Sequence, residues 1–501
     1  MLMETDTPKS GSVKQDSGFD ASERLWIGTM AAMLVVQLWF GLIGTSLWRD
    51  EAGTWWAVID GAAEAARRAF YWGGTSPLYF LTVWLSTRLF GLNEISLRLP
   101  SVLAMTGAVY FLYRIAEHLY DRSAAAVVAL VFLCISSFYA IDARPYALAM
   151  LFLTASTWAL LRWVDTRRLI YAGVYVVTAA LVVYAHYILA LGLAPGALFA
   201  AVSLRREPRT LARLGCFFAA IALLCIPLLR QLGAISSTRS AHTVTDFPGA
   251  PLILEGFMPG GLAGALILAV WIYHVWRGNA GLAGRCTALS AVLIVTWSLF
   301  APLFLFLLPT FSDFRLFLDR YYSSALPGQA LLLGGLISSI RPGIGRKALL
   351  VVLVAASILA QGKLTVRSHN NEDWRAALEF VKQEAGTAEP VLLQSCFVEG
   401  ADFAALRDAK LRDVLFAPAL VYGEPVKSIR LPNVFSGRYS RDAEDVVRQL
   451  ELAPRFLLLQ GDNNPSFEMW LLGRLGPRCR SEQAESFGYI SLRRFSCQDR
   501  R

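Results

Sequence analysis

Charged residues are scarce in this sequence. Asp, Glu, Lys and Arg make up 17% of the 501 residues, and hydrophobic residues make up 55%, whereas about 25% charged residues is usual for soluble globular domains. This composition excludes an ordinary soluble protein. Apolar runs long enough to cross a bilayer recur from Leu25 to about Gly362, which predicts a polytopic membrane protein over this region.

The net charge of +9 does not indicate nucleic-acid binding. The basic residues cluster in short loops between apolar runs, and this pattern is typical of membrane topology. The apolar run after the polar first 24 residues is too long for the hydrophobic region of a signal peptide, so we expect an uncleaved first span. The predicted parts are a cytoplasmic polar tail (1–24), a transmembrane module (25–362) and a soluble domain (366–501).

Cysteine is also infrequent, with seven residues in the chain. Four lie in or beside apolar runs and are interpreted as small packing residues: Cys134, Cys216, Cys225 and Cys286. Cys479 and Cys497 bracket two expected antiparallel strands of the soluble domain. They could form a disulfide if that domain lies outside the cytosol, but spacing alone does not establish the geometry.

The hydropathy pattern predicts eleven membrane spans. They are residues 25–47, 99–118, 124–141, 146–163, 169–185, 187–203, 214–229, 260–276, 287–308, 325–340 and 347–362. A twelfth apolar segment, Pro77–Phe90, is short, carries Arg88 and ends at Gly91. Segments of this length are more often interfacial than spanning, so we do not count it.

The loops between these spans differ in charge. One set of short loops contains 14 basic residues, which are Arg114, Arg122, Arg162, Arg167, Arg168, Arg205, Arg206, Arg209, Arg213, Arg277, Arg285, Arg341, Arg346 and Lys347. The opposite set contains five, which are Arg144, Arg230, Arg239, Arg315 and Arg320. The positive-inside rule makes the first set cytoplasmic, together with the amino terminus. The soluble domain is then extracytoplasmic.

Polar residues at the ends of different spans converge on the predicted extracytoplasmic face. They lie in "SLWRDEAGTWW" (Asp50, Glu51), "IDARPYALAM" (Asp142, Arg144, Tyr146), "YAHYILAL" (His186), "LDRYYSSALPG" (Arg320, Tyr321) and the loop with Arg239. Each charge would cost about 2.5–3.5 kcal/mol at the bilayer centre, so these residues must lie in the interface or in a hydrated cavity. Ordinary interfacial caps are the alternative interpretation.

These motifs, together with "SLRLPS" around Arg98 and "NNEDWRAALEFV" in the soluble domain, resemble the polyprenol-dependent glycosyltransferases of the GT-C fold. That group includes protein O-mannosyltransferases, lipid A aminoarabinose transferases and rhizobial lipopolysaccharide galacturonosyltransferases. The resemblance implies an all-α polytopic module with interfacial helices in the first external loop, followed by an α/β domain. It also implies a catalytic base at the Asp-Glu motif, which is Asp50 here.

The chemistry of such a reaction fits these residue types. A sugar on a polyprenyl phosphate already has a good leaving group, so a carboxylate must remove a proton from the acceptor hydroxyl. Arginines stabilise the charge that grows on the departing phosphate. One displacement by the acceptor inverts the anomeric carbon. Neighbouring helical residues point about 100° apart, so we assign the base to Asp50 and support or orientation to Glu51.

Four residues are candidates for binding the donor phosphate. Arg320 is the first choice, with Tyr321 beside it, although an arginine extending to the interface explains it as well. Arg98 is the second, and a buried ion pair with an acid such as Glu94 is its alternative. Many relatives have His or Lys before the proline of "SPLYF", where this chain has Thr75-Ser76. Arg239 is a candidate to replace that missing positive charge.

The remaining candidates concern the acceptor and the sugar. Asp142 either contacts the acceptor beside Asp50 or caps the following helix. Arg144 and Tyr146 are candidates for sugar contacts, and Tyr146 is alternatively an interfacial anchor. His186 is either functional or a hydrogen-bonded packing residue. With Glu51 it offers only two ligands, too few to predict a metal, so no cofactor is predicted and a divalent ion stays open.

The soluble domain alternates helical and strand-like stretches, which predicts an α/β layer. The helical stretches are Trp374–Glu384, Ala401–Val414, Ala443–Leu450 and Phe467–Leu475, and the strands are Val391–Gln394, Arg455–Gln460 and Tyr489–Arg494. This domain has no glycine-rich phosphate loop and no HxxE metal spacing. We expect it to cover the site or to guide the acceptor.

Two other functions compete with a glycosyltransferase. A transporter or lipid flippase usually shows internal repeats and polar residues near mid-membrane, whereas this sequence has no repeat and has its charges at span ends. A scaffold or ligand receptor would use the same charges only as caps. The sequence predicts a bacterial inner-membrane enzyme and leaves open both the sugar and the acceptor, which is a lipopolysaccharide or other envelope glycan, a lipid or a protein.

Overall fold

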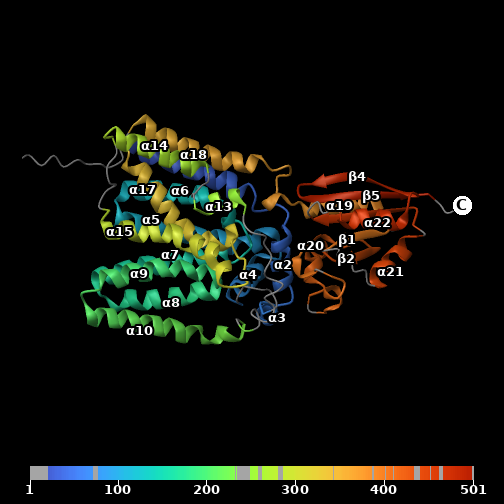
Figure 1. The fold of residues 1–501 in the computed structure, drawn as a ribbon, viewed down its shortest axis with the longest axis horizontal. Helices are drawn as coiled ribbons and strands as arrows, with labels where there is room; N and C mark the ends of the chain where they lie inside the picture. The colour runs from blue at the N-terminus through green and yellow to red at the C-terminus, as the bar shows by residue number, and fades with distance from the viewer. Residues whose placement is uncertain are drawn as a thin grey trace, which may run out of the picture.

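The computed structural model places a long helical bundle beside a smaller α/β domain (Figure 1). It describes residues 21–498 except 71–76, 232, 234–248, 258–261, 280–285, 342, 386–388, 401, 410, 434–440, 452 and 462–465. The bundle contains the chain up to Gly362, and the α/β domain begins shortly after it. The division agrees with the change from apolar to mixed composition in the sequence.

All eleven segments predicted to span the membrane are helical over most of their length. The helices are α1 (Ala21–Leu34, continued by η1, Val35–Phe40), α5 (Glu94–Leu119), α6 (Arg122–Ala140), α7 (Tyr146–Thr166), α8 (Leu169–Ala185), α9 (Leu193–Ser203, preceded by η2, Ile188–Gly192), α10 (Pro208–Cys225), α14 (Leu262–Trp276), α15 (Ala288–Leu307), α17 (Leu326–Ser339) and α18 (Ile344–Gly362). Within the described residues, six helices are long and apolar enough to cross a membrane, and four shorter apolar helices accompany them. The chain is therefore an integral membrane protein.

Helices in the middle of the bundle are more buried than helices at its margin. The apolar stretch of α7 is 72% buried, whereas that of the helical segment Pro208–Gln231, which begins with α10, is 11% buried although it is more hydrophobic. An apolar helix with so little protein contact is stable where lipid surrounds it, because its backbone groups are satisfied internally. Close packing inside the bundle uses small residues: a Cβ on Gly334 of α17 would lie 2.8 Å from the Cα of Val128 on α6.

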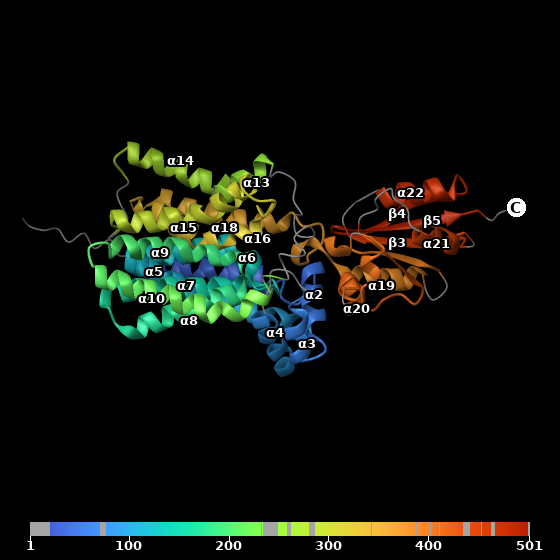
Figure 2. The ribbon, with the colours of Figure 1, turned by 60° about the horizontal axis from the view of Figure 1, so that its bottom comes forward.

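Three short helices lie at the end of the bundle that faces the α/β domain (Figure 2). They are α2 (Arg49–Val58), α3 (Ala62–Arg68) and α4 (Pro77–Phe90). α4 is the apolar segment that we did not count as a span, and Leu85, Leu89 and Phe90 near its end are exposed. This exposed apolar edge suits an interfacial helix, which the first external loop was predicted to contain.

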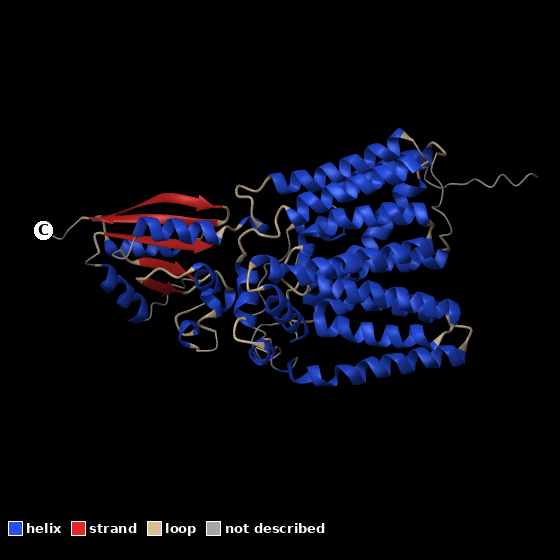
Figure 3. Cartoon of the chain, turned by 180° about the vertical axis from the view of Figure 1, so that it is seen from behind, coloured by secondary structure: helices blue, strands red, loops and turns tan. Residues whose placement is uncertain are grey.

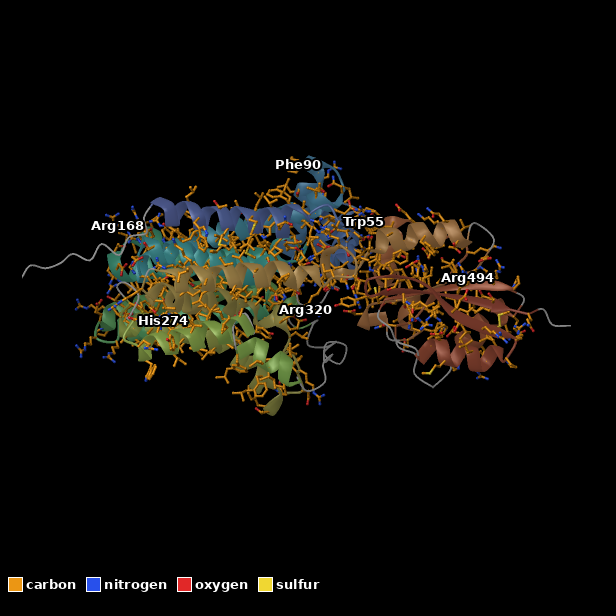
Figure 4. All side chains as sticks on the ribbon, turned by 90° about the horizontal axis from the view of Figure 1, so that it is seen from above. Trp55, Phe90, Arg168, His274, Arg320 and Arg494 are labelled. Atoms are coloured by element: carbon orange, nitrogen blue, oxygen red, sulfur yellow. A yellow bond between two sulfur atoms is a disulfide. The ribbon has the colours of Figure 1, made fainter. Side chains whose placement is uncertain are left out.

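The candidate site residues and the arginine-rich loops lie at opposite ends of the bundle, as the sequence predicts. Arg320 and Trp55 lie toward the end next to the α/β domain, and Arg168 and His274 lie toward the opposite end (Figure 4). Arg168 belongs to the arginine-rich set of loops. The arginine-rich loops and the α/β domain thus lie at opposite ends of the bundle. Which end faces the cytosol stays a prediction from the positive-inside rule.

The carboxyl-terminal domain contains a five-stranded sheet. Helices lie on both faces of this sheet (Figure 3). Its strands have the order β2 (Ser428–Leu431), β1 (Val391–Gln394), β3 (Arg455–Gly461), β5 (Ile490–Cys497) and β4 (Cys479–Phe487). β2, β1 and β3 are parallel, whereas β5 and β4 are antiparallel.

Alternation along β3 divides the core of this domain into two layers. Leu457 and Leu459 pack with α19 (Trp374–Ala385), and Leu458 packs with α21 (Arg441–Leu450) and α22 (Ser466–Leu475). The domain is therefore an α/β/α sandwich, as the sequence predicted in outline.

Two details of the predicted domain were wrong or missing. The segment 401–414 is not one helix but contains 3-10 turns, at Ala405–Arg407 and from Val414 onward. Asp402 accepts a hydrogen bond from the backbone N–H of Ala405, near the start of the turn. The backbone is extended at Asp408, so the turn ends after three residues. Strand β2 was not predicted.

Cys479 and Cys497 do form a disulfide, joining the paired ends of β4 and β5.

Candidate active site

The Asp-Glu motif lies in the first turn of α2, at the end of the bundle beside the α/β domain. Trp48 precedes the helix, and the Glu51 carboxylate accepts a hydrogen bond from the Trp48 backbone N–H at 3.3 Å. The two acids then diverge. The Asp50 side chain is 15% exposed, whereas the Glu51 side chain is completely buried. Only Asp50 is open to a substrate.

Asp50 and Arg320 lie together although 270 residues separate them in the sequence. Arg320 belongs to the short helix α16 (Asp319–Tyr322), and its Nη1 donates to Asp50 Oδ2 at 3.3 Å. The guanidinium also lies 5.4 Å from the centre of the Tyr321 ring. The structure thus joins the predicted base with the first-choice phosphate ligand and its neighbour.

Arg144, Tyr146 and His186 lie around this pair. Burial alone would lower the pKa of Arg144, but the nearby Asp50 charge keeps it above its ordinary value. The ring of His186 lies 5.4 Å from that of Tyr146 and 6.0 Å from that of Tyr321. Burial, together with the charges of Arg144 and Arg320, lowers the pKa of His186 to about 3. His186 is therefore neutral near pH 7.

Two buried nitrogen atoms at this site have no hydrogen-bond partner among the described residues. They are Nε of Arg320 and Nδ1 of His186. Buried polar atoms are nearly always satisfied in folded proteins, so atoms without a partner at a partly open site indicate a place for a polar ligand. One positive and one neutral nitrogen group beside a carboxylate suit an anionic oxygen and a sugar hydroxyl.

Arg98 forms an ion pair with Glu51, and both side chains are completely buried. Its Nε donates to Glu51 Oε1 at 2.8 Å. Its two terminal nitrogen atoms donate to Glu51 and to the backbone carbonyl groups of Leu42, Ile43, Thr45 and Ser46. All three nitrogen atoms of Arg98 are committed to protein groups. The geometry thus contradicts phosphate binding by Arg98 and fits the ion-pair alternative.

The partner of Arg98 differs from the one we suggested, since Glu94 pairs with Arg375. Glu51 also accepts a hydrogen bond from the backbone N–H of Ala143 at 2.8 Å. Burial raises the pKa of Glu51, but the charge and hydrogen bonds of Arg98 outweigh burial and leave the pKa below its ordinary value. Glu51 is thus an ionised residue that joins the start of α2 to the loop of Arg144.

Asp142 is enclosed, in contrast to the predicted contact with an acceptor. Its side chain is 1% exposed and accepts a hydrogen bond from Trp48 Nε1 at 3.0 Å. It does not cap α7, whose N-cap residue is Pro145. Burial, as the main cause, raises the pKa of Asp142. A substrate that enters beside Asp50 therefore does not reach the Asp142 carboxylate in this structure.

Glu51, Asp142 and His369 are the one group of three metal-type ligands found among the described residues. Their ligand atoms lie within 4.8 Å of one another, and His186 is not part of the group. Each oxygen atom of Glu51 already accepts two hydrogen bonds, from Arg98 and from backbone N–H groups. A cation there would also face the Arg98 charge. We therefore assign no metal to this group.

Two predicted features cannot be placed in the structure, and two residues near the site were not predicted from the sequence. Arg239 and the departure at Thr75-Ser76 fall outside the described residues. His369 and Glu372 were not predicted, yet both contact the loop that leads to Asp50. Glu372 stands within the "NNEDWRAALEFV" motif, so the motif itself was the available signal. Its contacts join residues more than 300 positions apart, which sequence spacing does not reveal.

Comparisons with known proteins bear on the fold of the chain. The family model of dolichyl-phosphate-mannose-protein mannosyltransferases matches residues 74–229. The crystal structure of apo ArnT from Cupriavidus metallidurans, which is 14% identical, superimposes with a TM-score of 0.51 over 95% of this chain and 98% of that chain. This chain has the GT-C fold over nearly its whole length.

A second ArnT structure, from the same organism, is described as bound to undecaprenyl phosphate. It is 13% identical, with a TM-score of 0.50 and the same coverage of both chains. Among curated proteins, no sequence matches this chain. At these identities the structural likeness establishes the fold over nearly the whole chain, and residue roles must be argued from the site itself.

Proposed function

We propose that this enzyme transfers a sugar from a polyprenyl phosphate to a hydroxyl group of an extracytoplasmic acceptor, with Asp50 as the general base. The observation that carries the proposal is the pair of Asp50 and Arg320, whose Oδ2 and Nη1 atoms lie 3.3 Å apart at a partly exposed position. The ArnT structure bound to undecaprenyl phosphate supports a lipid phosphate of this class as the donor.

The reaction is a single displacement at the anomeric carbon. Asp50 accepts the proton of the acceptor hydroxyl as the hydroxyl oxygen forms a bond to that carbon. The bond between the anomeric carbon and the phosphate oxygen breaks, and its electron pair leaves with the polyprenyl phosphate. Because attack and departure occur on opposite faces of the sugar, the configuration inverts.

Arg320 and Arg144 are the proposed charge partners of the departing phosphate. The buried Nε of Arg320 has no hydrogen-bond partner among the described residues, and the guanidinium fork matches the spacing of phosphate oxygens. A phosphate at Arg320 competes with Asp50 for the same guanidinium. Donor binding would thus release the Asp50 carboxylate to act as a base, while neutral His186 hydrogen bonds to the sugar through Nδ1.

The proposed location is a bacterial inner membrane, with the amino terminus in the cytoplasm and the α/β domain outside it. The distribution of arginine between loops supports this orientation. The disulfide between Cys479 and Cys497 also supports it, since disulfides persist in oxidising compartments. The acceptor class is a lipopolysaccharide or other envelope glycan, a lipid or a protein.

Replacement of Asp50 by Asn tests the proposal. The Asp50→Asn side chain has the same size but is not basic, so we expect transfer to fall at least about 100-fold, within the range of general-base catalysis. The readout is mass spectrometry of envelope glycoconjugates in a deletion strain that carries each variant. Asp313→Asn is the matched control, because Asp313 is an exposed carboxylate in the loop before α16.

Two results would contradict the proposal. Wild-type transfer by the folded Asp50→Asn variant would exclude Asp50 as the base. Movement of a lipid-linked sugar across proteoliposomes without a new glycosidic bond would instead indicate a transporter.

A further inference from the structure

The segment that opens the α/β domain folds back onto the loop that leads to Asp50. The backbone N–H of His369 donates to Thr45 Oγ1 at 3.3 Å, and that of Arg375 donates to Ser46 Oγ at 3.1 Å. These contacts fall within the five residues before Asp50. The α/β domain thus touches the chain immediately before the proposed base.

Glu372 makes the most direct of these contacts. Its Oε2 accepts hydrogen bonds from the backbone N–H of Arg49 at 3.0 Å and from Trp374 Nε1 at 2.8 Å. Its Oε1 accepts one from Arg49 Nε at 2.8 Å. The Glu372 side chain is completely buried, and Arg49 also donates to the Cys396 carbonyl group, within the α/β domain. One carboxylate therefore holds both the backbone and the side chain of Arg49.

Arg49 is the first residue of α2, and Asp50 is the second. The first N–H groups of a helix have no partner inside it, and the helix dipole makes this end positive. The negative Glu372 carboxylate satisfies one of these groups from another domain. The position of the α2 amino terminus, and thus of Asp50 relative to Arg320, is fixed from the α/β domain.

We infer that Glu372 is a positioning residue for the transfer reaction, which aligns Asp50 by binding Arg49 at the start of α2. The inference rests on the proposed role of Asp50. It gives the α/β domain a part in catalysis beyond covering the site. Since the Glu372 side chain is completely buried and its partners are protein groups, its loss should act on the chemical step more than on binding.

Glu372→Gln is the test. The amide keeps the shape of the side chain but loses its charge, and its NH2 group would face one of the N–H groups that now donate to Glu372. We expect kcat to fall on the order of tenfold, since small misplacements of a catalytic group have effects of this size or larger. The KM for a purified polyprenyl-phosphate sugar should stay within about twofold of the wild-type value, as for a residue that acts on the transition state. The full-length enzyme is assayed in detergent.

Glu94→Gln is the matched control. Glu94 also joins the two domains, through Arg375 and the Tyr422 hydroxyl, but among the described residues it forms no hydrogen bond or ion pair with α2. Its kcat should equal that of the wild type. If Glu372→Gln does not fold, Arg49→Lys replaces it, because lysine keeps the charge and the backbone bond but loses the Nε bond, and kcat should again fall with unchanged KM.

The outcomes separate the two proposals. If Asp50→Asn abolishes transfer but Glu372→Gln keeps wild-type kcat, the positioning role is wrong and the base assignment stands. If Glu94→Gln loses as much kcat as Glu372→Gln, the effect comes from domain coupling in general, and the positioning role is also overturned. If Asp50→Asn retains transfer, the proposed function itself fails.

Discussion

Asp50 and Glu51 are neighbours in the sequence, yet their surroundings differ completely. Asp50 is partly exposed beside Arg320, whereas Glu51 is enclosed by Arg98 and backbone N–H groups. The rotation of about 100° between successive helical residues produces this difference. A carboxylate that must take a proton needs access to substrate, and a carboxylate that holds two loops together needs burial.

The buried ion pair leads to a prediction about stability. Glu51→Gln leaves the Arg98 guanidinium buried without a counter-charge, so we expect the free energy of unfolding to fall by about 3–5 kcal/mol. The measurement is the denaturation midpoint of the purified protein in detergent. Asp50→Asn is the control, because Asp50 is partly exposed and its replacement leaves no fully buried charge without a counter-charge. Equal midpoints for Glu51→Gln and the wild type would contradict the structural role of Glu51.

The same variant should change the pH dependence of stability. The pKa of Glu51 in the folded protein lies below its ordinary value of 4.5, so the unfolded chain binds more protons near that pH. The contribution of Glu51 is complete above about pH 4.5 and is lost as the pH falls through the lowered folded pKa. The difference in midpoint between wild type and Glu51→Gln should therefore be largest near pH 7 and shrink on acidification.

At the level of single elements, local patterns predicted most of the fold. Hydropathy located a helix at each of the eleven predicted spans, because a helix in lipid must be apolar over its whole length. The failures occurred where local pattern is weak. The segment 401–414 has helix-forming residues, but its turn at Ala405–Arg407 ends at Asp408, where the backbone is extended. Strand β2 is only four residues long and has mixed polarity.

The disulfide is an element whose contribution can be measured. Cys479 and Cys497 close an 18-residue separation between β4 and β5, and loops of this size contribute about 2–4 kcal/mol. We expect the double variant Cys479→Ser/Cys497→Ser to lower the urea midpoint for protease resistance of the α/β domain. A reductant should have the same effect on the wild type and no effect on the variant. Equal sensitivity of both proteins to reductant would contradict a structural disulfide.

At the scale of the whole molecule, the sequence predicted which residues face the same end of the bundle but not which of them touch. Asp50 and Arg320 were both assigned from motifs, and the fold brings them together. The partners of Arg98 and Arg49 could not be predicted, because each ion pair joins distant segments through the packing of entire helices and domains. The role of the α/β domain was left open for the same reason.

The orientation of the molecule gives the final prediction, since every proposal depends on the site lying outside the cytosol. Val426 in the α/β domain is 79% exposed, and Arg168 is exposed at the opposite end of the bundle. In intact cells, we expect a membrane-impermeant maleimide to label Val426→Cys but not Arg168→Cys, which should react only after permeabilisation. The unsubstituted chain controls for its own thiols. Reversed labelling would place Asp50 on the cytoplasmic side, where the positive-inside distribution of arginine would be violated and an extracytoplasmic acceptor could not reach the base.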